Sequence, residues 1–342
     1  MISVPPCDPG SAQHGRGVVA NRRRVTCLSK KLRIAGNIES DFDIADRGDL
    51  DGSTEAAALV EALRGSWGVI ASSELYSRGV IERLPGLRAI SRIGTGADTI
   101  DVPAATENGI AVTVLPGVNS GSVAEFALAL ILALNRNIVT LTTAPYAAAS
   151  AAPVGHDLAD QTVGLIGFGS IGQALALRLR AFGGPIIAHD VAADEDKMRA
   201  LGVTAVSLDE LLGRADVVSL HVPLMPATRG MIGRSELLAM KPGALLVNTA
   251  RGGLVDEDAL LEALRNGRLR GAGLDVTATE PLPLSHPLRQ QPQVIITPHV
   301  AAFTMGTAVR GLQAAIDNLS TIARGGLPPH CLNPEVLSRT CP

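Results

Sequence analysis

Three side chains with complementary chemistry, Arg251, Glu280 and His299, lie in the second half of this 342-residue chain, at or near the ends of short apolar runs. Arg251 follows Ala244–Asn248, and His299 follows Val294–Thr297. A guanidinium can hold a carboxylate through two parallel hydrogen bonds while it polarises a neighbouring carbonyl. An imidazole beside a carboxylate becomes a proton donor near neutral pH, because the negative charge favours its charged form. These residues are therefore candidates for carbonyl chemistry.

A glycine-rich turn lies upstream of this set. Gly167, Gly169 and Gly172 follow the apolar run Thr162–Ile166 and open a helical pattern. In such a turn the first glycine permits the sharp bend, the second lets the backbone approach a pyrophosphate, and the third allows close packing of helix and strand. Free N–H groups at the helix N-terminus then face the negative charge.

Asp190 supports this interpretation, because it ends the next apolar run. Its carboxylate can accept hydrogen bonds from an adenosine ribose and would repel a 2′-phosphate. The pattern predicts an NAD site and favours NAD over NADP. The alternative is a glycine turn that merely joins a strand to a helix.

Two series of apolar runs, alternating with helical patterns, indicate a parallel α/β architecture. The first series of expected strands is Leu32–Ala35, Gly68–Ala71, Ala89–Ile93 and Ala111–Val114. The second series is Thr162–Ile166, Pro185–His189, Val217–Val222, Ala244–Asn248, Gly271–Val276 and Val294–Thr297. The low-complexity stretch Ala144–Pro153, interrupted by proline, reads as a linker.

The two series predict two domains. A last helix, about Thr304–Arg324, comes too late to open a third domain, so we expect it to return to the first one. The predicted division is residues 32–118 plus 300–342 for a substrate-binding domain and 119–299 for an inserted NAD-binding domain. Residues 1–31 are rich in Arg and Lys and are predicted to be a disordered tail, with a targeting or interaction arm as the alternative.

Composition excludes several classes of protein. Lys and Arg total 30 and Asp and Glu total 33, so the formal net charge is −3, which argues against a basic nucleic-acid binder. Five Phe, two Tyr and one Trp are too few for base-stacking platforms. The longest strongly apolar helical run, Phe126–Leu134, is about half of a bilayer span. We expect neither a nucleic-acid partner nor a membrane.

The four cysteines, Cys7, Cys27, Cys331 and Cys341, lie near the two ends of the chain and form no Cys-x-x-Cys pair. This spacing disfavours a zinc site and a disulfide scaffold. The first residues also lack the apolar core of a secretory signal. We therefore expect no bound metal and a cytoplasmic location.

Taken together, the motifs resemble the D-isomer-specific 2-hydroxyacid dehydrogenases, especially their phosphoglycerate-dehydrogenase-like branch. The motifs are Gly167–Gly172, Asp190, His221–Leu224, Asn248–Gly253, Gly273–Val276, Glu280–Pro281 and Thr297–His299. The resemblance covers about residues 65–325. It implies two flavodoxin- or Rossmann-like doubly wound parallel-sheet domains, the nucleotide-binding one inserted into the substrate-binding one, and a homodimer. The implied activity is NAD-dependent hydride transfer between a small 2-oxo acid and the D-2-hydroxy acid.

The resemblance also implies roles for individual residues. Arg251 would bind and polarise the 2-oxo acid, His299 would be the general acid/base, Glu280 would orient and charge His299, and Asp275 would lie near the nicotinamide. The implied cofactor-binding positions are Gly167, Phe168, Gly169, Ser170, Ile171, Gly172, Asp190, His221, Val222, Pro223, Thr228, Thr249, Ala250, Arg251, Asp275 and His299.

The implied substrate site joins Arg251 and His299 to a loop of the first domain, where the backbone N–H groups of Thr95 and Gly96 would face the substrate carboxylate. The sequence departs from this branch of the family at Ala71. In the branch, the strand that precedes the substrate loop usually ends in Arg-Ser, whereas here it ends in Ala71-Ser72. The missing cation argues against 3-phosphoglycerate as the substrate. Two alternatives stay open: an NAD-sensing scaffold without catalysis, and an NADPH-linked glyoxylate or hydroxypyruvate reductase.

Overall fold

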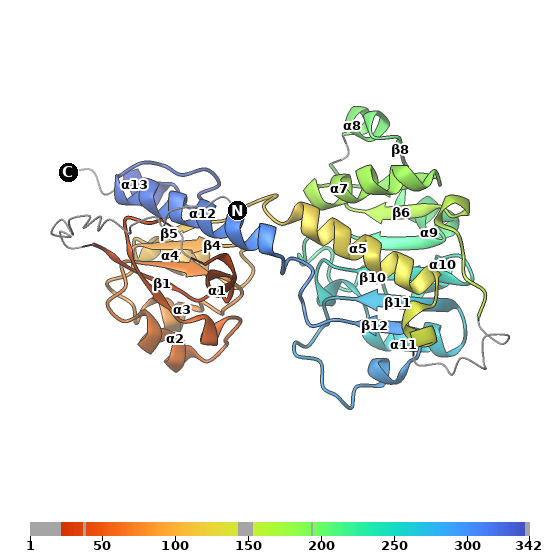
Figure 1. The fold of residues 1–342 in the computed structure, drawn as a ribbon, viewed down its shortest axis with the longest axis horizontal. Coiled ribbons are helices and arrows are strands. Elements are labelled where there is room, and N and C mark those ends of the chain that lie inside the picture. Colours follow the sequence, from red (N-terminus) through yellow and green to blue (C-terminus); the bar gives the residue numbers. More distant parts are fainter. Residues whose placement is uncertain (1–21, 37–38, 143–152, 193, 339–342) are drawn as a thin grey trace, which may run out of the picture.

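The computed structural model describes residues 22–36, 39–142, 153–192 and 194–338, which form two α/β lobes side by side (Figure 1). Each lobe is built on one parallel β-sheet with helices on both faces. The predicted linker 144–153 falls almost wholly outside the described residues. The expected fold class, two parallel-sheet α/β domains, is confirmed.

The first sheet has five strands in the order β2-β1-β3-β4-β5. Its strands are β1 (Arg24–Cys27), β2 (Asp43–Asp46), β3 (Gly68–Ala71), β4 (Ala89–Arg92) and β5 (Ala111–Thr113). Its helices are α1 (Lys31–Ala35), α2 (Ala56–Leu63), α3 (Arg78–Ile81), α4 (Val102–Glu107), α12 (Met305–Ala323) and α13 (Glu335–Ser338), with a 3₁₀ turn at Gly48–Leu50.

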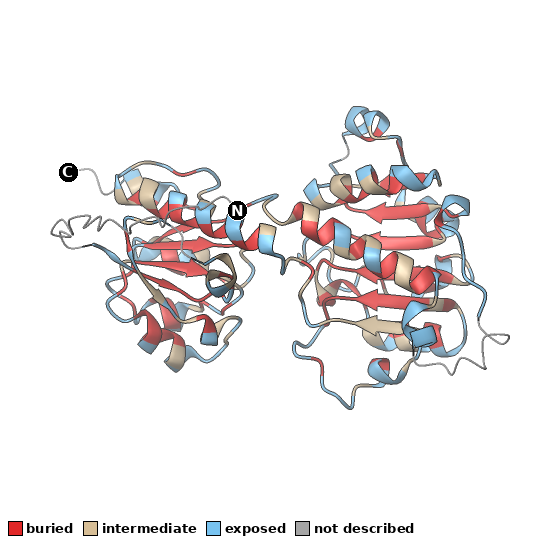
Figure 2. Cartoon of the chain, in the orientation of Figure 1, coloured by how far each residue is buried: buried red, intermediate tan, exposed pale blue. Residues whose placement is uncertain are grey.

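Alternating side chains of each strand serve the two faces, as a two-residue period requires. Val69 of β3 joins the apolar cluster under α2, α3 and α4, whereas the next residue, Ile70, joins the cluster under α12. Leu319 of α12 lies directly over Gly68, where an added Cβ would come within 3.2 Å of its side chain. Strands β3, β4 and β5 are therefore buried on both faces (Figure 2).

The start of the first domain corrects two predictions. Residues Arg24–Cys27, assigned to the disordered tail, form the second strand of the sheet, and Leu32–Ala35, expected as a strand, lies in helix α1. Strand β2 was not predicted. The many cationic residues of segment 1–31 suggested a solvated arm. A strand of four residues needs only a few apolar side chains, however, and Val25 and Cys27 supply them, because both are fully buried.

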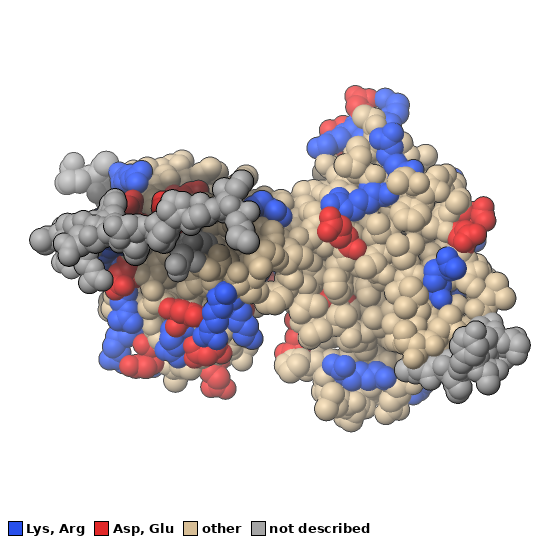
Figure 3. All heavy atoms as spheres, in the orientation of Figure 1, with Lys and Arg blue, Asp and Glu red and all other residues tan. Residues whose placement is uncertain are grey.

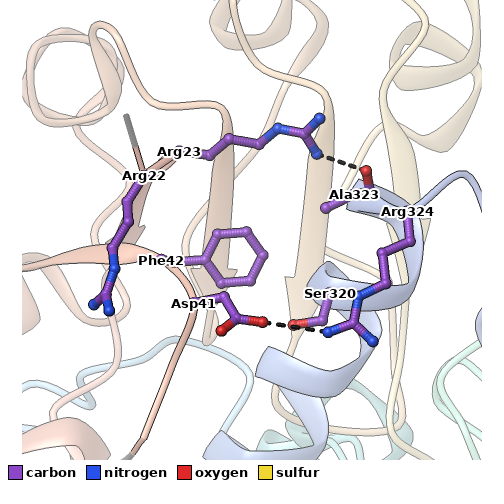
Figure 4. A pocket seen from close by; sticks show the side chains of 7 residues that line it. All are labelled: Arg22, Arg23, Asp41, Phe42, Ser320, Ala323 and Arg324. Carbon is purple, nitrogen blue, oxygen red and sulfur yellow. Dashed lines mark hydrogen bonds and ion pairs between the residues drawn. The ribbon is translucent and has the colours of Figure 1, made fainter. Parts of the chain in front are cut away.

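The basic residues before β1 are accommodated at the amino end of the sheet (Figure 4). Arg23 donates to the carbonyl oxygen of Ala323 at 2.8 Å, and its guanidinium lies 4.8 Å from the centroid of the Trp67 ring. Arg324 and Asp41 form an ion pair at 3.2 Å beside it. A cation at the C-terminus of α12 also suits the helix dipole.

The second sheet has seven strands in the order β12-β11-β10-β9-β6-β7-β8, and all its ladders are parallel. Its strands are β6 (Val163–Ile166), β7 (Ile186–His189), β8 (Val203–Ala205), β9 (Val217–Leu220), β10 (Ala244–Asn248), β11 (Leu269–Leu274) and β12 (Val294–Ile296). Its helices are α5 (Ser120–Asn135), α6 (Ile138–Thr142), α7 (Ser170–Leu179), α8 (Glu195–Ala200), α9 (Leu208–Arg214), α10 (Arg234–Ala239) and α11 (Glu257–Arg265). Among these strands, only β8 was not predicted.

The same alternation builds the core of this domain. Leu165 of β6 packs in the cluster with α5 and α7, and Ile166 packs in the cluster with α9, α10 and α11. The sheet grows in both directions from β6, because β7 lies on one side of it and β9 on the other. That reversal is the switch point at which doubly wound sheets bind their ligands.

The chain crosses between the lobes twice, before α5 and before α12 (Figure 1). The two crossings are tied together by hydroxyls, since Ser122 lies 2.9 Å from Thr304 and 2.8 Å from Thr307. Helix α12 then packs on the first sheet, so the seven-stranded domain is inserted into the five-stranded one.

Surface charge of both signs is interspersed over the face in Figure 3. Within the described ranges, no helix has the length and apolar character that crossing a bilayer requires.

Replacement of Val25 by Ala tests the placement of β1 in the core. We expect Val25→Ala to lower the free energy of unfolding of the first domain by about 1.5–3 kcal/mol, because Val25 is fully buried. The matched control is Val154→Ala, which removes the same atoms from a side chain that is 87% exposed. This control should change the free energy of unfolding by less than about 0.5 kcal/mol. Equal effects in urea denaturation would place residue 25 outside the core.

Candidate functional site

The predicted site residues lie at one edge of the second sheet, because parallel strands place all their carboxyl ends there. Gly167 follows β6, Asp190 follows β7, His221 follows β9, and Asp275 follows β11. The segment Thr249–Arg251 follows β10, and Thr297–His299 follows β12.

The glycine turn has the geometry that its sequence predicts. Gly167 has φ +97°, and a Cβ there would come within 2.7 Å of the His221 backbone. A Cβ on Gly172 would overlap the carbonyl oxygen of Gly167, so the third glycine permits the close approach of α7 to β6. Gly169 caps α7, and a Cβ there would meet open space. The remaining turn residues, Phe168, Ser170 and Ile171, connect these glycines.

The carboxylate of Asp190 closes the turn from the neighbouring strand. Its Oδ2 accepts from the Phe168 N–H at 2.7 Å, and its Oδ1 accepts from the Ala192 N–H at 2.9 Å. Asp190 therefore lies against the first loop of the dinucleotide motif, where a ribose would be recognised.

Two buried polar atoms at the same edge have no hydrogen-bond partner among the described residues: Nδ1 of His221 and Oγ1 of Thr249. Buried polar atoms in folded proteins nearly always have a partner, so both fit a ligand that supplies hydrogen bonds. Burial lowers the pKa of His221 to about 4, so the imidazole is neutral at neutral pH. The open helix N-terminus, Asp190 and these two atoms together fit NAD.

Glu280 and His299 form a direct contact, with Oε2 of Glu280 2.8 Å from Nδ1 of His299. Burial of Glu280 acts to raise its pKa, but the hydrogen bond from His299 and its charge outweigh this effect and the net pKa is lowered. The Thr277 N–H holds the other oxygen of Glu280 at 3.2 Å. Since Nδ1 is engaged by Glu280, Nε2 is the ring nitrogen left for another partner.

Asp275 anchors the loop that carries His299. The Asp275 carboxylate, almost fully buried, accepts from the Thr297 hydroxyl at 2.7 Å and from the N–H groups of Val300 and Ala301 at 2.9 Å. His299 itself has φ +55°, a left-handed conformation that non-glycine residues adopt rarely and that often occurs at functional sites. Asp275 thus supports His299, and its predicted contact with the nicotinamide stays a prediction.

Arg251 is brought beside this pair by close backbone packing. A Cβ on the next residue, Gly252, would overlap the backbone of Thr277, so only glycine allows the loops after β10 and β11 to approach so closely. The charge of Arg251 reaches Glu280 and contributes to its lowered pKa. Nη1 of Arg251 donates to the Ala250 carbonyl oxygen at 2.7 Å.

The predicted substrate loop of the first domain faces Arg251 from across the boundary between the lobes. A Cβ on Gly96 would come within 2.6 Å of Nη2 of Arg251, and Thr95 is exposed beside it. The structure therefore places Gly96 against Arg251, and the roles of Thr95 and Gly96 toward a substrate stay a prediction. Thr228 is different: its hydroxyl donates to the Pro223 carbonyl within its own loop, so its role toward a cofactor stays a prediction.

The sequence analysis assigned no role to two nearby charged residues, Arg92 at the end of β4 and Asp98 in the loop that follows. Asp98 accepts two hydrogen bonds from Arg251, each at 3.2 Å. Arg92 is only 8% exposed, and its Nε has no hydrogen-bond partner within the described ranges. Burial lowers the pKa of Arg92, and the nearby positive charge of Arg251 adds to the effect. A charged residue at the end of a buried strand was the available signal for Arg92.

The described residues contain no group of three or more His, Cys, Asp and Glu side chains placed to hold a metal ion. The hollow in Figure 4 lies at the amino end of the first sheet, opposite the edge that carries the site.

Comparison with known proteins adds independent findings. Residues 128–301 match the family described as D-isomer-specific 2-hydroxyacid dehydrogenase, NAD binding domain. The chain is 40% identical over 264 residues to a glyoxylate reductase of Korarchaeum cryptofilum, which covers 75% of this chain and 80% of the relative. It is 39% identical over 267 residues to a D-3-phosphoglycerate dehydrogenase of Mycobacterium leprae, which covers 78% of this chain but half of that relative.

Among solved structures, the NAD-complexed D-isomer-specific 2-hydroxyacid dehydrogenase of Lactobacillus delbrueckii ssp. bulgaricus is similar at a TM-score of 0.74 and 29% identity. The similarity covers 91% of this chain and 100% of that one. Its NAD-binding character agrees with the glycine turn and the unpartnered polar atoms described above.

A glycine pair in the second domain tests the turn. We expect Gly172→Ala to weaken NADH binding at least about tenfold, because the new methyl group must displace the Gly167 carbonyl. Gly213→Ala is the control, since a Cβ there meets nothing within 4 Å, and its NADH affinity should equal that of the wild type. Titration of NADH fluorescence measures both. Unchanged affinity in Gly172→Ala would show that the turn does not hold the dinucleotide.

Proposed function

The chain belongs to the D-isomer-specific 2-hydroxyacid dehydrogenase family, and we propose that it interconverts a small 2-oxo acid and the D-2-hydroxy acid through Arg251, Glu280 and His299. As a family member it is an oxidoreductase with an NAD-binding domain. The observation that carries the residue assignment is the 2.8 Å contact between Glu280 and His299, placed next to Arg251 at the ligand-binding edge of the sheet.

His299 is the proton donor in the reducing direction. Its Nε2 gives a proton to the carbonyl oxygen of the 2-oxo acid, and in the reverse direction the same nitrogen removes the proton from the hydroxyl. Glu280 binds Nδ1, which fixes the orientation of the ring. The bound nicotinamide supplies or accepts the hydride.

Arg251 holds the carboxylate of the substrate and polarises the adjacent carbonyl. The N–H groups of Thr95 and Gly96 supply further hydrogen bonds to the carboxylate from the first domain. The buried charge of Arg92 adds to the positive potential that attracts an anion to this loop. These groups come from both domains, so the boundary between the lobes is the proposed reaction site.

Relatives are named for glyoxylate and for 3-phosphoglycerate, so the substrate question is best addressed with a panel. At position 71, a fully buried alanine offers no cation to a phosphate. We therefore expect glyoxylate, pyruvate or hydroxypyruvate to be reduced faster than phosphohydroxypyruvate or phosphonopyruvate. An NAD-sensing scaffold would oxidise NADH with none of them.

We also propose a homodimer in the cytoplasm. Helix α6 carries three exposed apolar residues, Ile138, Val139 and Leu141, and exposed apolar side chains that lie close together in the sequence are a candidate subunit contact. Light scattering on the purified protein distinguishes one subunit from two.

The carboxylate of Asp190 predicts the choice of nucleotide. Because a carboxylate and a 2′-phosphate repel each other at close range, we expect kcat/KM for NADH to exceed that for NADPH by about tenfold or more. Initial rates with both cofactors measure this ratio at a fixed concentration of 2-oxo acid. Equal use of NADPH would contradict the assignment of Asp190 and favour an NADPH-linked reductase.

Loss of the proton donor should be severe. We expect His299→Ala to lower kcat by about 100-fold or more with NADH affinity retained, because proton transfer by a positioned side chain contributes that much. The control is His156→Ala, which removes an exposed imidazole from a segment distant in sequence from His299. This control should leave kcat unchanged. Wild-type turnover in His299→Ala would remove His299 from the mechanism.

A further inference from the structure

We propose that Asp98 is a positioning residue for this reaction, which holds the Arg251 guanidinium across the boundary between the two domains. This inference rests on the function proposed above. Asp98 lies in the substrate loop of the first domain and Arg251 follows β10 of the second, so the ion pair joins positions far apart in the chain.

The hydrogen bonds of Arg251 show what Asp98 leaves free. Nε and Nη2 each donate to a different oxygen of the Asp98 carboxylate at 3.2 Å, and Nη1 donates to the Ala250 carbonyl oxygen at 2.7 Å. A guanidinium has five N–H donors in a fixed plane. Within the described part of the chain, two N–H groups of Arg251 remain for another partner, one on Nη1 and one on Nη2. Donors on the two terminal nitrogens of a guanidinium can bind a carboxylate or the adjacent oxygens of a 2-oxo acid.

The negative charge of Asp98 also acts on two positive charges, those of Arg251 and Arg92. Burial of Asp98 acts to raise its pKa, but the hydrogen bonds and charge of Arg251, with a further contribution from Arg92, lower it overall. Arg92 is buried with no partner for its Nε in the described part of the chain, and the charge of Arg251 acts against it. Without the Asp98 carboxylate, the repulsion between the two guanidiniums would not be offset and Arg251 would lose the ion pair that holds it.

The backbone links this ion pair to the substrate loop. A Cβ on Gly96 would overlap the Asp98 carboxylate and crowd Nη2 of Arg251, so glycine leaves the space in which the pair forms. The N–H groups of Thr95 and Gly96 and the carboxylate of Asp98 therefore belong to one short, closely packed segment. Fixing Arg251 to Asp98 fixes it relative to the amides proposed to bind the substrate.

The ion pair between Asp98 and Arg251 could also oppose substrate binding, and this alternative predicts a different result on removal of the carboxylate. If Asp98 occupied the donors that the substrate needs, it would compete with the substrate, and its removal would tighten binding. The two free donors of Arg251 favour positioning over competition.

The experiment compares Asp98→Asn, Asp98→Glu and Asp41→Asn with the wild type. Asp41→Asn is the matched control, because Asp41 and Arg324 form another Asp–Arg ion pair at 3.2 Å, remote from the site. The measurements are kcat and KM with NADH and the best 2-oxo acid, and the Kd values of NADH and of oxamate with the NADH complex. Oxamate has the shape and charge of a 2-oxo acid but cannot be reduced.

For Asp98→Asn we expect kcat to fall and the oxamate Kd to rise, each by about tenfold or more, while the NADH Kd and the thermal midpoint stay near those of the wild type. Asp98→Glu restores the charge and should recover part of kcat. Asp41→Asn should match the wild type. Tighter oxamate binding or a lower KM in Asp98→Asn would overturn the proposal in favour of competition, and unchanged constants would overturn it outright. Failure of the wild type to reduce any 2-oxo acid would instead refute the proposed function, with the oxamate comparison still deciding the role of Asp98.

Discussion

Parallel alignment of every strand is the constraint on which the rest of this structure depends. In a parallel sheet all carboxyl ends lie at one edge, so each loop after a strand can contribute one group to a common site. The second sheet uses this edge for the glycine turn, Asp190, Arg251, Glu280 and His299. The reactive side chains come from several different loops. The order of the strands places these loops next to one another, and the buried apolar residues on both faces of the sheet stabilise that order.

Glycines allow these loops to approach as closely as the chemistry needs. Gly172 lets α7 pack against the turn after β6, and Gly252 lets the loop of Arg251 touch the backbone at Thr277. Neither position tolerates a Cβ without displacement of a neighbouring carbonyl. Asp275 completes the arrangement, since its buried carboxylate accepts from the Thr297 hydroxyl before His299 and from the backbone N–H of Val300 after it. These bonds hold His299 in a backbone conformation that an unsupported histidine rarely adopts.

The sequence predicted the second domain better than the first, and the reason is physical. The strands of the second domain are continuous apolar runs with recognisable turn residues after them, and all but the short edge strand β8 were found. Strand β1 was not predicted, because it begins within a run of arginines whose charges suggested a solvated tail. The structure places Arg23 against Trp67 and the end of α12 instead, a contact between distant segments that local patterns do not contain. Contacts between the lobes could not be predicted for the same reason, because Asp98 and Arg251 are distant in the sequence and come into contact only in the folded chain.

In the proposed reaction, Arg251, Glu280 and His299 converge on one carbonyl group beside a bound nicotinamide. A crystal structure of the complex with NADH and oxamate would show whether they do. We expect Nε2 of His299 within hydrogen-bond distance of the oxamate amide oxygen, the remaining donors of Arg251 on the oxamate oxygens, and Glu280 still bound to Nδ1. A structure in which the His299 ring points away from the oxamate, or in which the oxamate lies elsewhere, would contradict it.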